Sequence, residues 1–270
     1  MGAVPDPLDD FTRTSFAARG IEHDVLRSGD GPAVIVIAEI PGVTPAVADF
    51  ARRVRDLGCT VVLPVLFGEP GREPSGGYAA SSFVRACVAR EFAAFATGRT
   101  APVALWLRAL AGHARSSCGG PGVGVVGMCF TGGFALGTMV DGDVVAPVLS
   151  QPSLPLPPFR PRARASLQLS PGDLERVRQR AAAGVCVMGL RFTEDIAVPE
   201  ARFAALRAEL GDAFIGVEID SSRGNPWGIR TRAHSVLTED LVDEPGHPTR
   251  QALDQVLGFL GERLLRPGDP

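Results

Sequence analysis

The sequence predicts an α/β fold in which a mostly parallel central sheet is flanked by helices on both faces. Short apolar runs rich in β-branched residues alternate with longer segments that have helical spacing. The first of these runs, residues 33–40, is apolar at every position except Glu39, which is typical of a strand covered on both faces. With 270 residues, of which 45% are hydrophobic, the chain is long enough to bury one large core.

The predicted elements follow one another in the order that such a fold requires. Residues 33–40 form the first strand, and a helix at 45–57 and a strand at 60–66 come next. Helices at 78–96 and 102–114 then precede a strand at 123–128 and a helix at 130–140. The remaining segments are predicted as strands at 144–149, 184–190 and 213–219 and as helices at 199–210 and 248–265.

We expect one α/β domain over residues 21–270, preceded by an N-terminal extension at 1–20. Residues 151–164 are so rich in proline that they form neither a helix nor a central strand. We interpret them as a surface excursion rather than a linker, because the strand pattern resumes at Gly184 without a change in composition.

The net charge, the basic residues and the cysteines exclude several kinds of partner and of chemistry. The net charge is -3, which argues against nucleic acid or a membrane surface as a partner. All 27 basic residues are arginine, which excludes a Schiff-base lysine and a P-loop lysine. Five cysteines without a C-x-x-C pair favour a reduced compartment. Since neither a secretion signal nor a membrane span is recognisable, a cytoplasmic location is expected.

Cys129 is the most informative residue, because it ends an apolar run and precedes a helix made of small residues. A nucleophile elbow needs this layout: a strand, a sharp turn with small neighbours, and a helix whose N-terminus points at the nucleophile. The helix dipole favours the thiolate, which is the attacking species. The alternative is that Cys129 only fills a gap in the core, since cysteine is often buried.

A second alternative uses Gly122, Gly124 and Gly127, which spell the G-x-G-x-x-G fingerprint of dinucleotide-binding proteins, with Asp141 and Asp143 at a suitable distance. That fingerprint follows a strand and opens a helix. Here the glycines follow a turn-like segment and lie inside the apolar run, which disfavours an oxidoreductase that binds NAD(P).

A cysteine nucleophile needs a base and a carboxylate that orients the base, and both follow later strands. Asp195 comes after the strand at 184–190, and His234 comes after the last strand. The order nucleophile, acid, histidine is that of α/β-hydrolases. The nearest rivals are Glu194 for the acid and His247 for the base, because His23 and His113 lie upstream of the nucleophile.

These pieces together resemble the dienelactone hydrolase family, the cysteine branch of the α/β-hydrolases. The resemblance extends over about residues 21–265. Four motifs carry it: Ala38-Glu39-Ile40-Pro41-Gly42-Val43, Gly127-Met128-Cys129-Phe130, Asp195-x-x-Val198-Pro199 and Ala233-His234-Ser235.

The resemblance implies an α/β-hydrolase fold and a triad of Cys129, His234 and Asp195. It also implies that the backbone N–H groups of Ile40 and Phe130 form the oxyanion hole. In the family, a glutamate at the position of Glu39 lies beside the resting thiol and governs its ionisation. An acid inside the apolar segment that follows residue 33 is unusual, which favours a function for Glu39.

The sequence departs from the family pattern at two positions. Thr131 stands where a glycine is usual, two residues after the nucleophile, and Thr238 stands where the family has a substrate-binding arginine. Arg85 and Arg90 are candidates for a second arginine that binds an anionic substrate. Arg230 and Arg232 are candidates to take over the role of the family arginine whose position Thr238 occupies here.

We therefore expect a hydrolase that cleaves a small-molecule ester or lactone through a covalent acyl-enzyme, as a monomer or homodimer, without cofactor or metal. Two alternatives remain open. One is the NAD(P)-binding oxidoreductase, and the other is a thiol-sensing protein that kept the fold and lost the activity.

Overall fold

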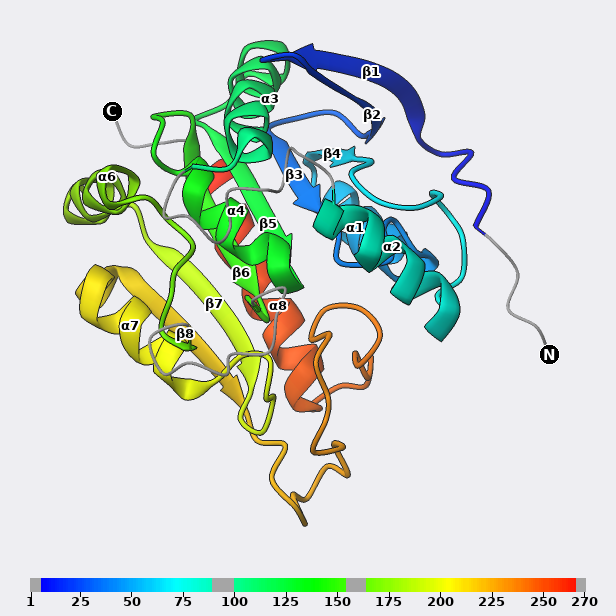
Figure 1. Ribbon diagram of the computed structural model, residues 1–270, viewed down its shortest axis with the longest axis vertical. Helices are drawn as coiled ribbons and strands as arrows, with labels where there is room; N and C mark the ends of the chain where they lie inside the picture. Colours follow the sequence, from blue (N-terminus) through cyan, green and yellow to red (C-terminus); the bar gives the residue numbers. More distant parts are fainter. Residues whose placement is uncertain (1–5, 89–99, 154–163, 266–270) are drawn as a thin grey trace.

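A computed structural model of the protein describes residues 6–88, 100–153 and 164–265. Its centre is an eight-stranded sheet with the strand order β1-β2-β4-β3-β5-β6-β7-β8 (Figure 1). β3 to β8 run parallel, whereas β1 pairs antiparallel with β2, and β2 with β4. The predicted mostly parallel sheet is therefore confirmed. The strands are β1 (Thr12–Ala18), β2 (Ile21–Ser28), β3 (Ala33–Ile37), β4 (Thr60–Pro64), β5 (Val123–Met128), β6 (Val144–Ser150), β7 (Val187–Phe192) and β8 (Phe214–Ile219).

Helices cover both faces of the sheet and divide the core into two layers. α3, α4, α6 and α7 pack on one face, and α1 and α8 pack on the other. Figure 1 shows α3 and α4 in front of the strands and α8 behind them. The helices are α1 (Pro45–Asp56), α2 (Gly76–Val88), α3 (Pro102–Cys118), α4 (Gly132–Thr138), α6 (Pro171–Ala182), α7 (Glu200–Leu210) and α8 (Pro248–Leu264).

The central strands explain why helices can approach from both sides. Every residue of β3, β4 and β5 is buried, as the continuous apolar runs predict. Within β5, a Cβ on Gly124 would lie 2.9 Å from a methyl group of Leu260 in α8. Glycine at this position therefore lets α8 pack close to the middle of the sheet.

The hairpin of β1 and β2 was not predicted, and it corrects the expected boundary at residue 20. Residues 12–18, which we assigned to an N-terminal extension, form the edge strand of the sheet. Arg19 and Gly20, both with positive φ, make the tight turn between the two strands. Most of β1 is exposed, so it lacks the apolar pattern by which the other strands are recognised.

Other differences concern single elements. β3 ends at Ile37, three residues before the predicted end, which leaves Glu39 and Ile40 in the loop after the strand. α6 was not predicted, because few of its residues are buried and its apolar stripe is short. The last residues of the predicted helix at 78–96 and most of the proline-rich segment at 151–164 lie outside the described residues.

Among the helices that the structure describes, none has both the length and the hydrophobicity of a membrane span.

Candidate active site

The predicted strand, turn and helix around Cys129 are present. β5 ends at Met128, Cys129 has φ +57°, and a short 3₁₀ turn over Cys129–Thr131 leads into α4. A Cβ on Gly127 would lie 2.4 Å from the carbonyl oxygen of Thr131, and one on Gly132 would lie 2.7 Å from the Cβ of Pro152. These positions accept only glycine, which is the steric requirement of a nucleophile elbow.

Thr131, which departs from the family pattern, fits the elbow because its hydroxyl is used. The Oγ1 accepts a hydrogen bond from the backbone N of Met128 at 2.8 Å and lies 2.9 Å from the carbonyl oxygen of Ile37, to which it donates. The side chain is fully buried. Thr131 thus ties the elbow to the neighbouring strand β3, and its β-branched side chain does not disturb the turn.

His234 and Asp195 lie beside each other at the edge of the sheet where the parallel strands end. Asp195 follows β7 and His234 follows β8, and the Nδ1 of His234 is 2.6 Å from the Oδ2 of Asp195. The other carboxylate oxygen of Asp195 accepts a hydrogen bond from the backbone N of Ala197 at 2.9 Å. The sulfur of Cys129, a ring nitrogen of His234 and a carboxylate oxygen of Glu39 all lie within 4.8 Å of one another.

The electrostatics favour a charged imidazole at this site. Burial of His234 opposes its protonation, but the negative charge of a Cys129 thiolate and the hydrogen bond to Asp195 raise the pKa of His234 to about 11. The pKa of His234 is thus raised because its positive charge is attracted to the groups of Cys129 and Asp195 that face the ring.

The rivals of His234 and Asp195 have other roles in the structure. The Nδ1 of His247 accepts a hydrogen bond from the backbone N of Thr249 and so caps α8. The rings of His23 and His113 pack against Trp106 and Phe16. Glu194 is exposed, whereas Asp195 is buried against the imidazole.

Glu39 is buried and is held by three neutral donors. Its Oε2 accepts hydrogen bonds from Gln151 Nε2 at 3.2 Å and from Ser235 Oγ at 2.8 Å, and its Oε1 accepts one from Thr238 Oγ1. Thr238, which occupies the place of an arginine in the family pattern, thus contacts the carboxylate without neutralising its charge. No cationic side chain is therefore among the hydrogen-bond donors that hold Glu39 in the described part of the chain.

Three residues that sequence reasoning missed also contact the site. Ser153 Oγ lies 3.0 Å from Cys129 Sγ, Gln151 binds Glu39, and Asp240 accepts hydrogen bonds from the backbone N of His234 and Ser235. The first two lie in the loop after β6, and nothing in their local sequence indicates contact with the thiol. Asp240 lies in a turn, and aspartate is common in turns, so its presence there does not indicate a role at the site.

The candidate arginines do not form an anion site among the described residues. Arg90 and the side chain of Arg85 lie outside the described part of the chain. Arg230 forms an ion pair with Asp240 at 2.8 Å, and Arg232 is exposed. Arg230 lines one side of a cleft of about 640 Å³ whose other walls include Glu39, Ile40 and Glu239.

The glycines of the alternative dinucleotide fingerprint serve packing. Gly124 and Gly127 lie inside β5 and pair with β3 and β6, so no glycine-rich turn follows the strand. A Cβ on Gly122 would lie 2.6 Å from a methyl group of Val145 in β6. The phosphate-binding geometry of the fingerprint is therefore absent from residues 122–127.

Glu39, Cys129 and His234 are also the one group of potential metal ligands within the described ranges. An oxygen, a sulfur and a nitrogen are the atoms that zinc prefers. Both carboxylate oxygens of Glu39, however, already accept hydrogen bonds from Gln151, Ser235 and Thr238. The carboxylate is therefore arranged for these donors, and the set suits proton transfer better than metal binding.

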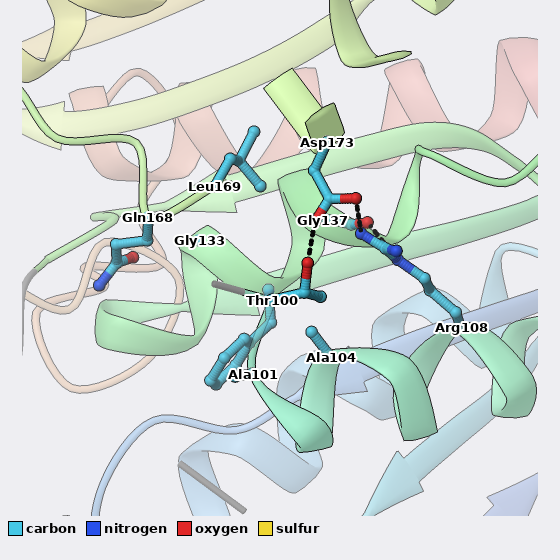
Figure 2. Close-up of a pocket in the computed structure, with 10 residues that line it drawn as sticks. Thr100, Ala101, Ala104, Arg108, Gly133, Gly137, Gln168, Leu169 and Asp173 are labelled. Atoms are coloured by element: carbon cyan, nitrogen blue, oxygen red, sulfur yellow. Dashed lines mark hydrogen bonds and ion pairs between the residues drawn. The ribbon is translucent and has the colours of Figure 1, made fainter. Parts of the chain in front are cut away.

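The helix behind the elbow is supported by a buried ion pair. Figure 2 shows Arg108 of α3 and Asp173 of α6 side by side, with Gly137 of α4 next to them. These three residues and Gly133 line a cavity of about 10 Å³. Arg108 lies 3.0 Å from Asp173 and donates to the carbonyl oxygen of Gly137 at 2.9 Å. Although burial opposes ionisation, the hydrogen bond from Thr100 and the charge of Arg108 lower the pKa of Asp173. α4 is thereby fixed to two other helices.

Comparison with known proteins gives one family and one fold. A profile of the Dienelactone hydrolase family matches residues 23–166, more than half of the chain. No curated protein matches the chain at a significant level. Solved structures of other proteins share the fold over nearly their whole length.

A protein from Klebsiella pneumoniae subsp. pneumoniae that is assigned as a dienelactone hydrolase is 18% identical, with a TM-score of 0.63 over 93% of this chain and 98% of that one. A dienelactone hydrolase from Anabaena variabilis is 17% identical, with a TM-score of 0.60 over 94% and 98%. A dienelactone hydrolase-like promiscuous phosphotriesterase from metagenomic libraries is 16% identical, with a TM-score of 0.59 over 94% and 98%. The α/β-hydrolase fold is therefore confirmed.

Proposed function

Because this chain belongs to the dienelactone hydrolase family, we propose that it hydrolyses a carboxylic ester or lactone through a covalent acyl-enzyme on Cys129. The observation that carries this proposal is the position of the Cys129 sulfur at a nucleophile elbow, within 4.8 Å of an imidazole that Asp195 holds at 2.6 Å. This is the relation between nucleophile, base and orienting carboxylate that acyl transfer requires.

In the first half-reaction, the Cys129 thiolate attacks the carbonyl carbon, and the carbonyl π electrons move to oxygen. The backbone N–H groups of Ile40 and Phe130 stabilise the resulting oxyanion. When the tetrahedral intermediate collapses, the bond to the alkoxy group breaks, and the imidazolium of His234 donates a proton to the leaving alcohol. In a lactone, the leaving hydroxyl stays attached to the acyl group.

In the second half-reaction, neutral His234 takes a proton from water, and the hydroxide attacks the thioester carbon. The carbon–sulfur bond then breaks, which releases a carboxylic acid and restores the thiolate and the imidazolium. Asp195 keeps the ring in the tautomer and orientation that both steps need, because it accepts the hydrogen bond from Nδ1.

The location of Glu39 suits control of the resting thiol. Its buried carboxylate lies within 4.8 Å of the sulfur and disfavours a second negative charge there, whereas His234 favours it. A substrate that displaces Glu39 from the sulfur removes this repulsion, so the thiolate becomes more available once substrate is bound.

The test is a panel of activated aryl esters and lactones with the wild type and the variants Cys129→Ala and His234→Ala. Both variants are expected to lose at least about 1,000-fold in kcat/KM. Cys186→Ala, a half-buried cysteine in the segment before β7, is the matched control and is expected to keep wild-type turnover. Hydrolysis that survives in both site variants would overturn the mechanism.

The two alternatives predict other results. A thiol sensor without activity predicts that the wild type turns over none of the panel, although Cys129 reacts with iodoacetamide. An oxidoreductase predicts a thermal shift with NAD(P)H, which a hydrolase of this fold does not require.

A further inference from the structure

Ser153 contacts the candidate nucleophile twice. Its Oγ lies 3.0 Å from Cys129 Sγ, and its backbone N donates to the Cys129 carbonyl oxygen at 3.0 Å. Ser153 is 2% exposed and comes three residues after the end of β6. Its hydroxyl is therefore shielded from water and faces the thiol.

The loop that carries Ser153 is fixed at each residue. The backbone N of Gln151 donates to the carbonyl oxygen of Leu190 at 2.8 Å, and Arg202 Nη1 donates to that of Pro152 at 3.0 Å. The carbonyl oxygen of Ser153 accepts a weaker bond from Gln168 at 3.4 Å. The distance between the hydroxyl and the sulfur is thus set by the fold and not by a free side-chain rotation alone.

The hydroxyl is best satisfied as a donor to sulfur. Within the ranges that the structure describes, Cys129 Sγ is the one hydrogen-bond partner of Ser153 Oγ. A thiol is a weak donor, whereas a thiolate is an acceptor only. The O–H of Ser153 therefore has a strong partner only when Cys129 is ionised.

We propose that Ser153 donates a hydrogen bond to the Cys129 thiolate and so increases the ionised fraction of the nucleophile at rest. The inference rests on the proposed function only for its consequence in catalysis, because the ionisation of Cys129 can be measured without turnover. Ser153 is thus a second group, besides the imidazole of His234, that stabilises the thiolate.

Two charged groups from other elements also face the sulfur. His234, from the loop after β8, favours the thiolate, and Glu39, from the loop after β3, opposes it. Asp195 acts through His234, to which it is hydrogen-bonded. All three remain in a Ser153 variant, so a change in thiol ionisation there reports the loss of the hydroxyl.

The proposal predicts opposite effects at low and high pH. Without the hydroxyl, fewer Cys129 thiols are ionised at low pH, so reactions of the thiolate slow down. A thiolate that is less stabilised is intrinsically more nucleophilic, since reactivity rises with basicity with a coefficient of about 0.4–0.5. At high pH, where the thiol is fully ionised, the variant therefore reacts faster than the wild type.

The experiment measures the ultraviolet absorbance of the thiolate and the rate of iodoacetamide alkylation as functions of pH, with the Cys129→Ala signal subtracted. Ser153→Ala is expected to raise the apparent pKa of the thiol by about one unit. Alkylation then slows about three- to fourfold on the acidic side, where the tenfold loss of thiolate outweighs the gain in nucleophilicity, and accelerates about threefold on the alkaline side. Ser153→Thr, which keeps a hydroxyl, is expected to restore the wild-type curve.

Ser221→Ala is the matched control. Ser221 is also buried, but its Oγ accepts a hydrogen bond from the backbone N of Glu194 and does not contact the sulfur. Its curve is expected to follow that of the wild type. If the alanine variant of Ser153 does not fold, Ser153→Gly tests the same loss.

An unchanged thiol pKa in Ser153→Ala, or alkylation that slows equally at all pH values, would overturn the proposal. Either result leaves the hydrolase mechanism intact, because that mechanism is tested separately by the turnover of the wild type, Cys129→Ala and His234→Ala.

Discussion

The Oδ2 of Asp195 lies 2.6 Å from the Nδ1 of His234, although 39 residues separate them in the chain. The carboxylate is buried and its second oxygen is bound by the backbone N of Ala197, so its orientation is fixed. With Nδ1 engaged, the other ring nitrogen, Nε2, is left for the sulfur of Cys129. In the proposed mechanism, the contact therefore decides which nitrogen of the ring exchanges protons with Cys129 and the substrate.

Asp195→Asn is expected to lower kcat/KM for an activated aryl ester about 1,000- to 10,000-fold, because an amide can donate to Nδ1 and stabilise the wrong tautomer. Glu194→Gln, which neutralises the adjacent exposed acid, is the control and is expected to stay within about twofold of the wild type. A loss of less than about tenfold in Asp195→Asn would remove Asp195 from the proposed triad.

The stability of the protein is expected to depend on pH through His234. Burial opposes the imidazolium, but Cys129 and Asp195 raise its pKa from 6.5 to about 11 in the folded state. Because the folded pKa lies above the unfolded one, the charged ring stabilises the fold fully below about pH 6.5 and progressively less as the pH rises toward 11.

Urea unfolding of the wild type and of His234→Gln at several pH values measures this contribution. The difference in the free energy of unfolding is expected to decrease between about pH 6.5 and pH 9. The decrease should be smaller in a Cys129→Ser background, because the thiolate contributes to the shift. A difference that stays constant or grows with pH contradicts the assignment of a charged imidazole.

The ion pair of Arg108 and Asp173 (Figure 2) is expected to stabilise the helix behind the elbow. Asp173→Asn leaves the guanidinium of Arg108 buried without a counter-charge, so we expect a loss of ~3 kcal/mol in the free energy of unfolding. Because the pKa of Asp173 is lowered, the wild type keeps this contribution above about pH 4 and loses it as the pH falls further.

Replacing both partners tests whether the loss comes from the unpaired charge. The double variant Arg108→Met, Asp173→Leu is expected to recover part of the stability in chemical denaturation, because it leaves no buried charge behind. If the double variant is no more stable than Asp173→Asn, the charge is not the cause.

Two glycines near the elbow are expected to respond oppositely to alanine. A Cβ on Gly127 would lie 2.4 Å from a backbone oxygen of Thr131, so Gly127→Ala is expected to lose ~2–3 kcal/mol and most of the activity. Gly137, inside α4, offers ordinary contact at 3.5 Å from a methyl group of Leu169, so Gly137→Ala is expected to gain up to ~1 kcal/mol from helix propensity.

Thermal or chemical unfolding of the two variants, with aryl ester turnover beside it, measures both effects. Equal stability of the two variants would contradict the close approach at Gly127.

The positions of Cys129, Asp195 and His234 relative to the strands could be predicted from the sequence. Each residue follows a strand of the parallel part of the sheet, and parallel strands bring their carboxyl ends to one edge. The elbow also has a local signature, since Gly127 is required by its close approach to the backbone of Thr131, four residues later. The periodicity of the apolar residues and these short motifs therefore carry the prediction.

The surroundings of the thiol could not be predicted, because they depend on loop conformation. Gln151, with φ +36°, binds Glu39 across 112 positions of the chain, and Ser235 binds the same carboxylate across 196. Ser153 reaches the sulfur only because its loop turns back over the elbow. β1 was missed for a different reason, since an exposed edge strand has no apolar face to recognise.

The left-handed backbone of Cys129 has a cost in stability. A non-glycine residue at φ +57° costs roughly 1 kcal/mol, and a glycine there removes that strain together with the thiol. The sulfur therefore occupies a position whose backbone conformation favours the one residue that has no side chain.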